Sequence, residues 1–211
     1  MIEKIETIVS DWSGVISDDA RPVYEANLRL LNDHGRRGIT FEEWRRLSGA
    51  TPSGFLENCG IKADPDKTYD DYKRYFSEIV ASGEKPNIFP GVRETLEELK
   101  KRGKRLIVLS SHPEENLAQE MQGYGIESFF ELTVGSAIDK VSGLRGICNR
   151  LLFGKRYTLY VGDTIYDVRA AKEAEVLSAA VCNGYHDRER LNAENPDFLL
   201  ENFSGLLEVV N

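Results

Sequence analysis

The chain of 211 residues is long enough for one domain, or for a core domain with a small inserted unit, and its 41% hydrophobic and 29% charged residues are typical of a globular protein. Its formal net charge of −8 at pH 7 argues against nucleic acid or an anionic membrane surface as a partner, because phosphate groups recruit clustered Lys and Arg. No apolar stretch approaches the length of a membrane span, which argues against a transmembrane protein.

The cysteines and the N-terminal segment indicate a cellular compartment. Cys59, Cys148 and Cys182 are far apart and lack the spacing of metal ligands, which is typical of reduced core residues. Residues 1–4 are charged and run straight into an expected strand, so no secretory signal is visible. We therefore expect a cytoplasmic protein, and the acidic composition is compatible with a monomer or a weak homodimer.

The first part of the chain predicts one strand followed by helices. Residues 5–10 alternate between apolar and polar side chains, which predicts a strand that leads into Asp11. Apolar residues then recur at helical spacing over 21–34, and Gly35 is expected to end that helix. Residues 18–87 as a whole predict an all-helical insertion without a strand. Its other helix starts are marked by the capping motifs Thr40-Phe41-Glu42-Glu43, Thr51-Pro52 and Asp64-Pro65.

A regular alternation of helices and strands begins after Pro90-Gly91. Such alternation predicts an α/β fold, with a Rossmann-like parallel sheet covered by helices on both faces. Glycine-rich dinucleotide and P-loop fingerprints are absent. The predicted elements are helix 92–102, strand 105–110, helix 114–123, strand 131–135, helix 141–152, strand 157–161, helix 166–174, strand 177–182, a short strand at 198–200 and a helix over 203–210.

Polar residues that could carry chemistry follow several of the predicted strands. Asp11 follows the first strand, Ser110 ends a later one, and Asp163 and Asp167 follow a third. Open α/β sheets bind ligands at this edge, so these side chains and Lys140 are expected to converge. Each has an ordinary alternative, which is a helix cap for the carboxylates and the hydroxyl and a solvated surface position for the lysine. Together they suit the binding of a phosphoryl group beside a divalent metal.

Four stretches resemble the motifs of the haloacid dehalogenase (HAD) superfamily, in the right order. They are Asp11-x-Ser13-Gly14-Val15, Ser110, Lys140 and Gly162-Asp163-x-x-x-Asp167. Phe89-Pro90-Gly91-Val92, Ser111-His112-Pro113 and Gly184-Tyr185 are further similar to its phosphoglycolate phosphatase-like branch. The resemblance covers residues 1–17 and 88–211. It implies a catalytic core in those two segments, with 18–87 as a helical cap.

The resemblance also implies a reaction and roles for the residues. A small phosphate monoester, part of a phosphorylated metabolite, would be cleaved through an aspartyl-phosphate on Asp11. A Mg²⁺ ion would be held by Asp11, Asp163 and the backbone carbonyl of Ser13, with Asp167 close or acting through water. The phosphoryl group would be bound by Ser110, Ser111, Lys140 and Gly14. In the family the segment 48–54 faces the catalytic cleft and helps to select the substrate, so Thr51 and Ser53 are expected to affect specificity. His112, expected to be structural or at the rim of the cleft, is a further candidate for specificity.

Ser13 departs from the family pattern. Phosphatases of this family usually carry a second aspartate there, which protonates the leaving group and then activates water. A serine hydroxyl is a poor proton donor at neutral pH, and positioned acid–base catalysis is commonly worth about 10²–10⁴-fold. We therefore expect weakened acid–base catalysis unless Asp18, Asp19 or His112 supplies the proton. Metal binding is not affected, because that position contributes its backbone carbonyl.

This departure leaves other functions open. Phosphonoacetaldehyde hydrolases, which cleave a C–P bond, carry Asp-Trp-Ala-Gly, close to Asp11-Trp12-Ser13-Gly14, but Pro52 stands where their cap lysine is expected. Haloacid dehalogenases also lack the second aspartate, yet they need no metal, whereas Asp163 and Asp167 suggest one. The third alternative is a catalytically weak phosphate-binding or regulatory protein.

Overall fold

The computed structural model describes residues 4–152 and 154–211. Residues 1–3, which the sequence places just before the first strand, lie outside the described residues. In the described part of the chain six strands form one sheet, and all neighbouring pairs are parallel. Their order across the sheet is β5 (Leu132–Val134), β4 (Arg105–Leu109), β1 (Thr7–Ser10), β6 (Thr158–Gly162), β7 (Leu177–Val181) and β8 (Phe198–Leu200).

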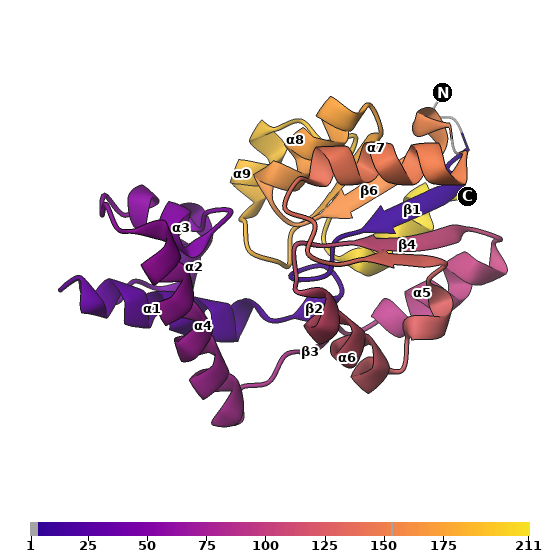
Figure 1. Cartoon of the computed structure of the whole chain (residues 1–211). Coiled ribbons are helices and arrows are strands. Elements are labelled where there is room, and N and C mark those ends of the chain that lie inside the picture. The colour runs from indigo at the N-terminus through magenta and orange to yellow at the C-terminus, as the bar shows by residue number, and fades with distance from the viewer. Residues whose placement is uncertain (1–3, 153) are drawn as a thin grey trace.

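Helices cover both faces of this sheet (Figure 1). Successive strand residues point to opposite faces, so Ile8 and Val9 of β1 belong to different core clusters. On the Ile8 face pack α5 (Val92–Lys101), α6 (Glu114–Tyr124) and α10 (Leu206–Val209), and on the Val9 face pack α7 (Lys140–Leu151) and α8 (Ile165–Ala174). The predicted Rossmann-like α/β fold is therefore confirmed.

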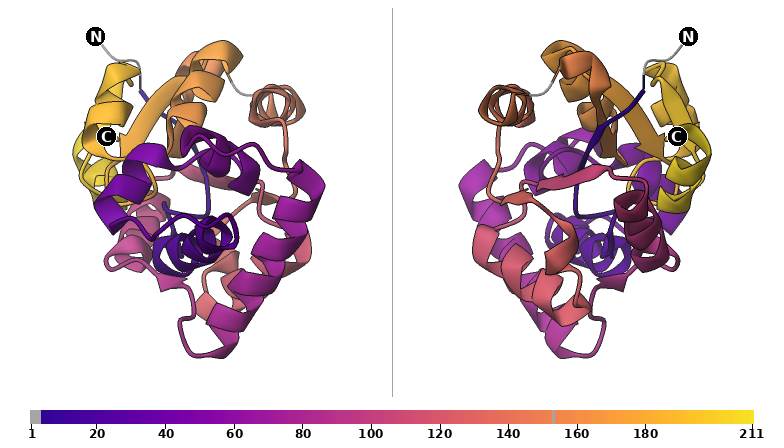
Figure 2. Two further views of the ribbon diagram at one scale, coloured as in Figure 1. Left: turned by 90° about the vertical axis from the view of Figure 1, so that its left-hand side faces the viewer. Right: turned by 90° about the vertical axis from the view of Figure 1, so that its right-hand side faces the viewer.

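Four helices between β1 and α5 form a separate group beyond the carboxyl ends of the strands (Figure 1), and in the left view of Figure 2 they lie in front of the sheet. Their own core includes Leu31, Trp44 and Phe55, each 1% exposed or less. The expected capping box is present, with Glu43 N–H donating to the Thr40 side chain. These helices are α1 (Ala20–Asp33), α2 (Phe41–Leu47), α3 (Pro52–Asn58) and α4 (Pro65–Ala81).

The structure corrects the sequence-based prediction at three places. The segment 18–87 is not free of strands, because β2 (Ser17–Asp18) and β3 (Asn87–Ile88) pair antiparallel where the chain leaves and re-enters the sheet region. Backbone groups of two adjacent connections satisfy one another in this way. A short helix that was not predicted, α9 (Arg188–Ala193), follows β7. The expected helix over 203–210 is split into η3 (Phe203–Gly205) and α10, and the turns η1 (Glu127–Phe129) and η2 (Lys155–Tyr157) complete the described elements.

The cysteines match the expectation of reduced core residues in part. Cys59, Cys148 and Cys182 are all unpaired, but only Cys148, which belongs to α7, is buried in the core, whereas Cys59 and Cys182 are half-buried. Within the described ranges, no helix has both the length and the apolar character needed to cross a bilayer.

Leu96 offers a test of the packing between α5 and the sheet. It is fully buried, so Leu96→Ala would remove methyl groups from the core and leave a cavity. We expect the free energy of unfolding, measured by urea denaturation, to fall by about 2–5 kcal/mol. Glu97→Ala, at the next and exposed position, is the control and should change it little. A small effect of Leu96→Ala would contradict the packing described.

Candidate active site

The predicted polar residues converge at the carboxyl edge of the sheet. Asp11 and Asp163 directly follow β1 and β6, Ser110 directly follows β4, and Lys140 is the first residue of α7. Parallel strands end at the same edge, and β1 lies between β4 and β6, where the strand order reverses. All four residues line one cavity of about 740 Å³.

Lys140 joins two of the carboxylates. Its Nζ donates to Asp11 Oδ2 and, at 2.6 Å, to Asp167 Oδ1. Burial alone would lower the pKa of Lys140, but the carboxylates of Asp11 and Asp167 raise it well above its ordinary value. The amine is therefore an ammonium group, which is the form that can neutralise a phosphoryl oxygen.

Asp167 is held by its own helix start. The Thr164 amide donates to its Oδ2 at 3.0 Å and the Asp167 amide donates to Thr164 Oγ1 at 3.3 Å, which together form a capping box. The Thr164 hydroxyl also donates to Oδ2, at 2.5 Å. The hydroxyl of Tyr160 donates to Oδ1 at 3.0 Å. Burial alone would raise the pKa of Asp167, but Lys140 and these hydrogen bonds hold it below its ordinary value. Asp167 therefore stays ionised. Tyr160 was missed by the sequence analysis, because it looks like a core residue of an apolar strand.

Asp163 fits into a space kept open by two glycines. A Cβ atom at Gly14 would lie 2.0 Å from Asp163 Oδ2, and one at Gly184 would lie 2.1 Å from the same atom. The backbone amide of Tyr185 donates to this oxygen at 2.6 Å. Burial, followed by the charges of Asp167 and Asp11, raises the pKa of Asp163 well above its ordinary value. Burial also raises the pKa of Asp11, although Lys140 opposes the shift.

These carboxylates form a donor set suited to a divalent cation. Oxygen atoms of Asp11, Asp163 and Asp167 lie within 4.8 Å of one another, and all three residues are buried. When ionised, three carboxylates beside the single ammonium of Lys140 leave about two negative charges uncompensated, which a dication would neutralise. Hard oxygen ligands of this kind are those that Mg²⁺ prefers. The buried triad therefore fits the predicted Mg²⁺.

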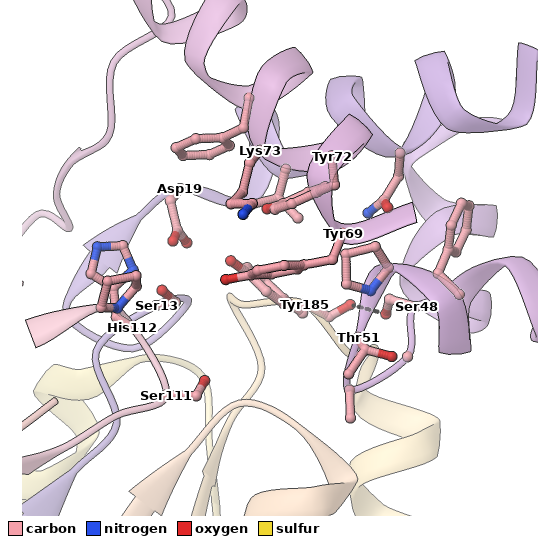
Figure 3. Close-up of a pocket in the computed structure, with 18 of the residues that line it drawn as sticks. Ser13, Asp19, Ser48, Thr51, Tyr69, Tyr72, Lys73, Ser111, His112 and Tyr185 are labelled. Atoms are coloured by element: carbon pink, nitrogen blue, oxygen red, sulfur yellow. Dashed lines mark hydrogen bonds between the residues drawn. The ribbon is translucent and has the colours of Figure 1, made fainter. Parts of the chain in front are cut away.

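A second cavity, of about 370 Å³, shares lining residues with the first and is bordered by the helices α1 to α4 (Figure 3). Ser13, Ser111 and Thr51 line both cavities, whereas His112 lines only the second. Thr51 Oγ1 also caps α3 by accepting from the Gly54 amide at 3.0 Å. The hydroxyl groups of Ser53 and Thr51 are hydrogen-bonded at 3.0 Å. Ser53 is not one of the described residues that line either cavity. The expected role of this group in specificity stays a prediction.

Asp19 is a buried carboxyl group in this second cavity, and the sequence analysis named it only as one of three alternative proton donors. It is 4% exposed, and its Oδ1 accepts from the Gly14 amide at 3.2 Å. Burial raises its pKa to about 6, and hydrogen bonds from the side chains of Ser13 and Tyr185 oppose the shift. In the sequence its signal is weak, because an aspartate just before a helix is typical of an N-cap.

The other two alternative donors are placed less favourably. Asp18 is exposed and belongs to β2. The His112 Nε2 lies 3.3 Å from Glu120 Oε1. Burial alone would lower the pKa of His112, but Glu120 raises it above its ordinary value. The ring of His112 is thus engaged by Glu120.

Arginines fasten α2 to the segment that carries Tyr185. Arg45 donates to the carbonyl oxygens of Cys182 at 2.5 Å and His186 at 2.7 Å. In return, Arg190 donates to the carbonyl oxygens of Arg45 at 2.8 Å and Ser48 at 3.1 Å. This clamp of Arg45 and Arg190 sets the position of the second cavity's roof over the carboxyl edge of the sheet. No sequence pattern marks this clamp, since its acceptors are backbone groups.

Comparisons with known proteins show the family and the fold. Residues 8–181 match the family model of the haloacid dehalogenase-like hydrolases. The phosphoglycolate phosphatase of Synechococcus elongatus is 34% identical over 209 residues, which cover 98% of this chain and 97% of that protein. The phosphoglycolate phosphatase of Pseudomonas putida is 29% identical over 213 residues, which cover 95% of this chain and 78% of that protein. The solved structure of a haloacid dehalogenase-like family protein from Streptococcus pneumoniae has a TM-score of 0.82 at 18% identity, over 98% and 99% of the two chains, which shows the fold alone.

Gly14→Ala tests whether the glycine keeps the space of the Asp163 carboxylate. The added Cβ would displace that carboxylate, and we expect Mg²⁺ affinity, measured by isothermal titration calorimetry, to fall by about 10–100-fold. Gly35→Ala is the matched control, because Gly35 has φ +69° against +71° at Gly14 but no atom within 4 Å of the added Cβ. Equal affinities for the two variants would contradict this role of Gly14.

Proposed function

Because the chain belongs to the haloacid dehalogenase-like hydrolase family, in its phosphoglycolate phosphatase-like branch, we propose that it is a metal-dependent phosphatase acting through an aspartyl-phosphate on Asp11. One observation carries the proposal: a single ammonium group, that of Lys140, contacts both Asp11 and Asp167 beside Asp163. A buried cluster of three carboxylates with one lysine lowers the stability of the fold. Phosphoryl transfer is a function that needs these groups close together.

Metal binding would use residues already in place. Asp11, Asp163 and the backbone carbonyl of Ser13 would hold Mg²⁺, with Asp167 close or acting through water. When bound, the ion supplies the positive charge that lets a carboxylate approach an anionic phosphate. Lys140 would share in this neutralisation, since it is an ammonium group next to the nucleophile.

The reaction would proceed in two displacements. One oxygen of Asp11 attacks phosphorus and the alkoxide of the substrate leaves, so that an acyl phosphate forms. Water then attacks that phosphorus and releases phosphate and free Asp11. Ser110 and Ser111, beside the same cavity, would hydrogen-bond the phosphoryl oxygens. The Gly14 amide, also expected to bind phosphate, already donates to Ser17 O at 2.9 Å and to Asp19, so its contribution would require a shared hydrogen bond.

The substrate we propose is a small phosphorylated metabolite. The relatives are named for phosphoglycolate, and the two cavities, of about 740 and 370 Å³, leave room for a small leaving group under α1 to α4. We keep residues 1–17 and 88–211 as the catalytic core and 18–87 as the cap. The proposal includes a cytoplasmic location, a monomer or weak homodimer, and neither nucleic acid nor membrane as a partner.

Lys73 bears on the alternative of a C–P bond hydrolase that forms an imine. It is the lysine of α1 to α4 that lines the second cavity (Figure 3). Its Nζ lies 2.8 Å from Asp70 Oδ1, and that hydrogen bond raises the pKa of Lys73. A protonated amine cannot attack a carbonyl group, so this lysine favours the phosphatase over the imine mechanism.

Asp11→Asn tests the phosphatase itself. We expect Mg²⁺-dependent hydrolysis of nitrophenyl phosphate to fall by at least about 10³-fold, because an amide cannot serve as the nucleophile. Asp66→Asn, an exposed position at the start of α4, is the control and should retain the wild-type rate.

Two results would contradict the proposal. One is a phosphatase rate that persists in Asp11→Asn. The other is a wild-type protein that binds phosphate together with Mg²⁺ but turns over none of a panel of phosphorylated metabolites, which would favour the binding or regulatory protein.

A further inference from the structure

The carboxyl group that the family pattern places at position 13 has a structural counterpart at position 19. Asp19 is buried, and it lines the smaller cavity together with Ser13 and Tyr185. The Gly14 amide donates to Asp19 Oδ1 at 3.2 Å, and the side chains of Ser13 and Tyr185 lie next to the same carboxyl group. Figure 3 shows the Asp19 carboxyl pointing from the start of α1 toward Ser13. A carboxyl group is thus held against the one motif residue that departs from the family pattern.

The two cavities give Ser13 a position between Asp19 and the nucleophile. Asp11 belongs to the lining of the larger cavity and Asp19 to that of the smaller one, whereas Ser13 lines both. The smaller cavity can hold the leaving group of a phosphate ester whose phosphoryl group is bound at Asp11, because it shares Ser13 with the larger cavity. In that arrangement the hydroxyl of Ser13 would lie between the ester oxygen and Asp19.

Other polar groups near this path have partners of their own. His112 faces Glu120 at 3.3 Å, and Lys73 pairs with Asp70 at 2.8 Å. Glu120 itself accepts from the indole N–H of Trp12 at 2.6 Å. Asp18 is exposed and lies outside both linings. In contrast to these side chains, Asp19 has its carboxyl group next to Ser13.

We propose that Asp19 exchanges protons with the substrate through the Ser13 hydroxyl and so replaces the missing aspartate. The inference rests on the proposed phosphatase function. In the first displacement the bond from Asp11 to phosphorus forms and the ester P–O bond breaks. The Ser13 proton then moves to the departing oxygen, and the Asp19 carboxylic acid returns a proton to Ser13. In the second displacement water passes its proton by the same route to the Asp19 carboxylate, which restores the acid.

Leaving-group dependence tests this relay. An alkoxide needs a proton to leave, whereas nitrophenolate does not, and kcat/KM reports only the steps up to the first irreversible one. In Asp19→Asn and Ser13→Ala we expect the ratio of kcat/KM for glycerol phosphate to that for nitrophenyl phosphate to fall by about 10²–10⁴-fold. Ser13→Thr, which keeps a hydroxyl, should retain the ratio. Asp18→Asn, the same change at the neighbouring exposed position, is the matched control and should also retain it.

A double variant distinguishes loss of the relay from a folding defect in Asp19→Asn. In Ser13→Asp/Asp19→Asn the carboxyl group is at position 13 itself, and we expect the ratio of kcat/KM for glycerol phosphate to that for nitrophenyl phosphate to return toward the wild-type value. An unchanged ratio in both Asp19→Asn and Ser13→Ala would overturn the relay. That result is distinct from failure of the phosphatase proposal, in which Asp11→Asn would keep its activity with either substrate.

Discussion

The site depends on one ammonium group that lies among three buried carboxylates. Without Lys140, Asp11, Asp163 and Asp167 would repel one another in a place where little water can screen them. Lys140 is also the first residue of α7, where a cation opposes the helix dipole. The Asp139 cap and the two carboxylates offset that unfavourable position. Much of the local architecture can be understood as support for this charge arrangement, including the capping box at Asp167 and the glycines around Asp163.

The acid–base chemistry of the chain is distributed differently from the family pattern. In the proposed site Ser13 would give its backbone carbonyl to the metal but has no carboxyl group of its own, while Asp19, at the start of α1, brings one to the same place. Because α1 is the first of the four helices above the sheet, the carboxyl group belongs to the boundary between the two parts of the molecule. Its position depends on Tyr185 as well, so the segment after β7 contributes to both the metal side and the leaving-group side of the cleft.

Sequence patterns were sufficient for the sheet and for the main site. Periodicity located the strands and helices after Pro90. The order of the motifs predicted that Asp11, Lys140 and Asp163 converge, and the structure places all three in the lining of one cavity. The pairing of β2 with β3 could not be predicted, because two-residue strands have no periodicity. The final helix was misjudged for a related reason, since an apolar pattern over 203–210 does not distinguish a 3₁₀ turn from an α-helix.

The parts of the site that sequence reasoning missed share a physical cause. Tyr160 uses a hydroxyl at the end of a ring that otherwise packs as core, and Gly184 contributes empty space rather than a contact. The Arg45 and Arg190 clamp binds backbone carbonyls, which every residue has. Such roles are set by tertiary position, so a single sequence carries no local pattern for them.

The clamp links access to the cleft with the integrity of the acidic cluster. Each hydrogen bond from an arginine of the clamp to a backbone carbonyl contributes about 1.5–3 kcal/mol to holding α2 in place. Because the acceptors carry no net charge, added salt should weaken these hydrogen bonds little. An outward swing of α2 has either to break these bonds or to draw the 182–190 segment along. In the second case the Tyr185 amide would leave the Asp163 carboxylate, so that opening of the cleft and loosening of the proposed metal site would be one motion.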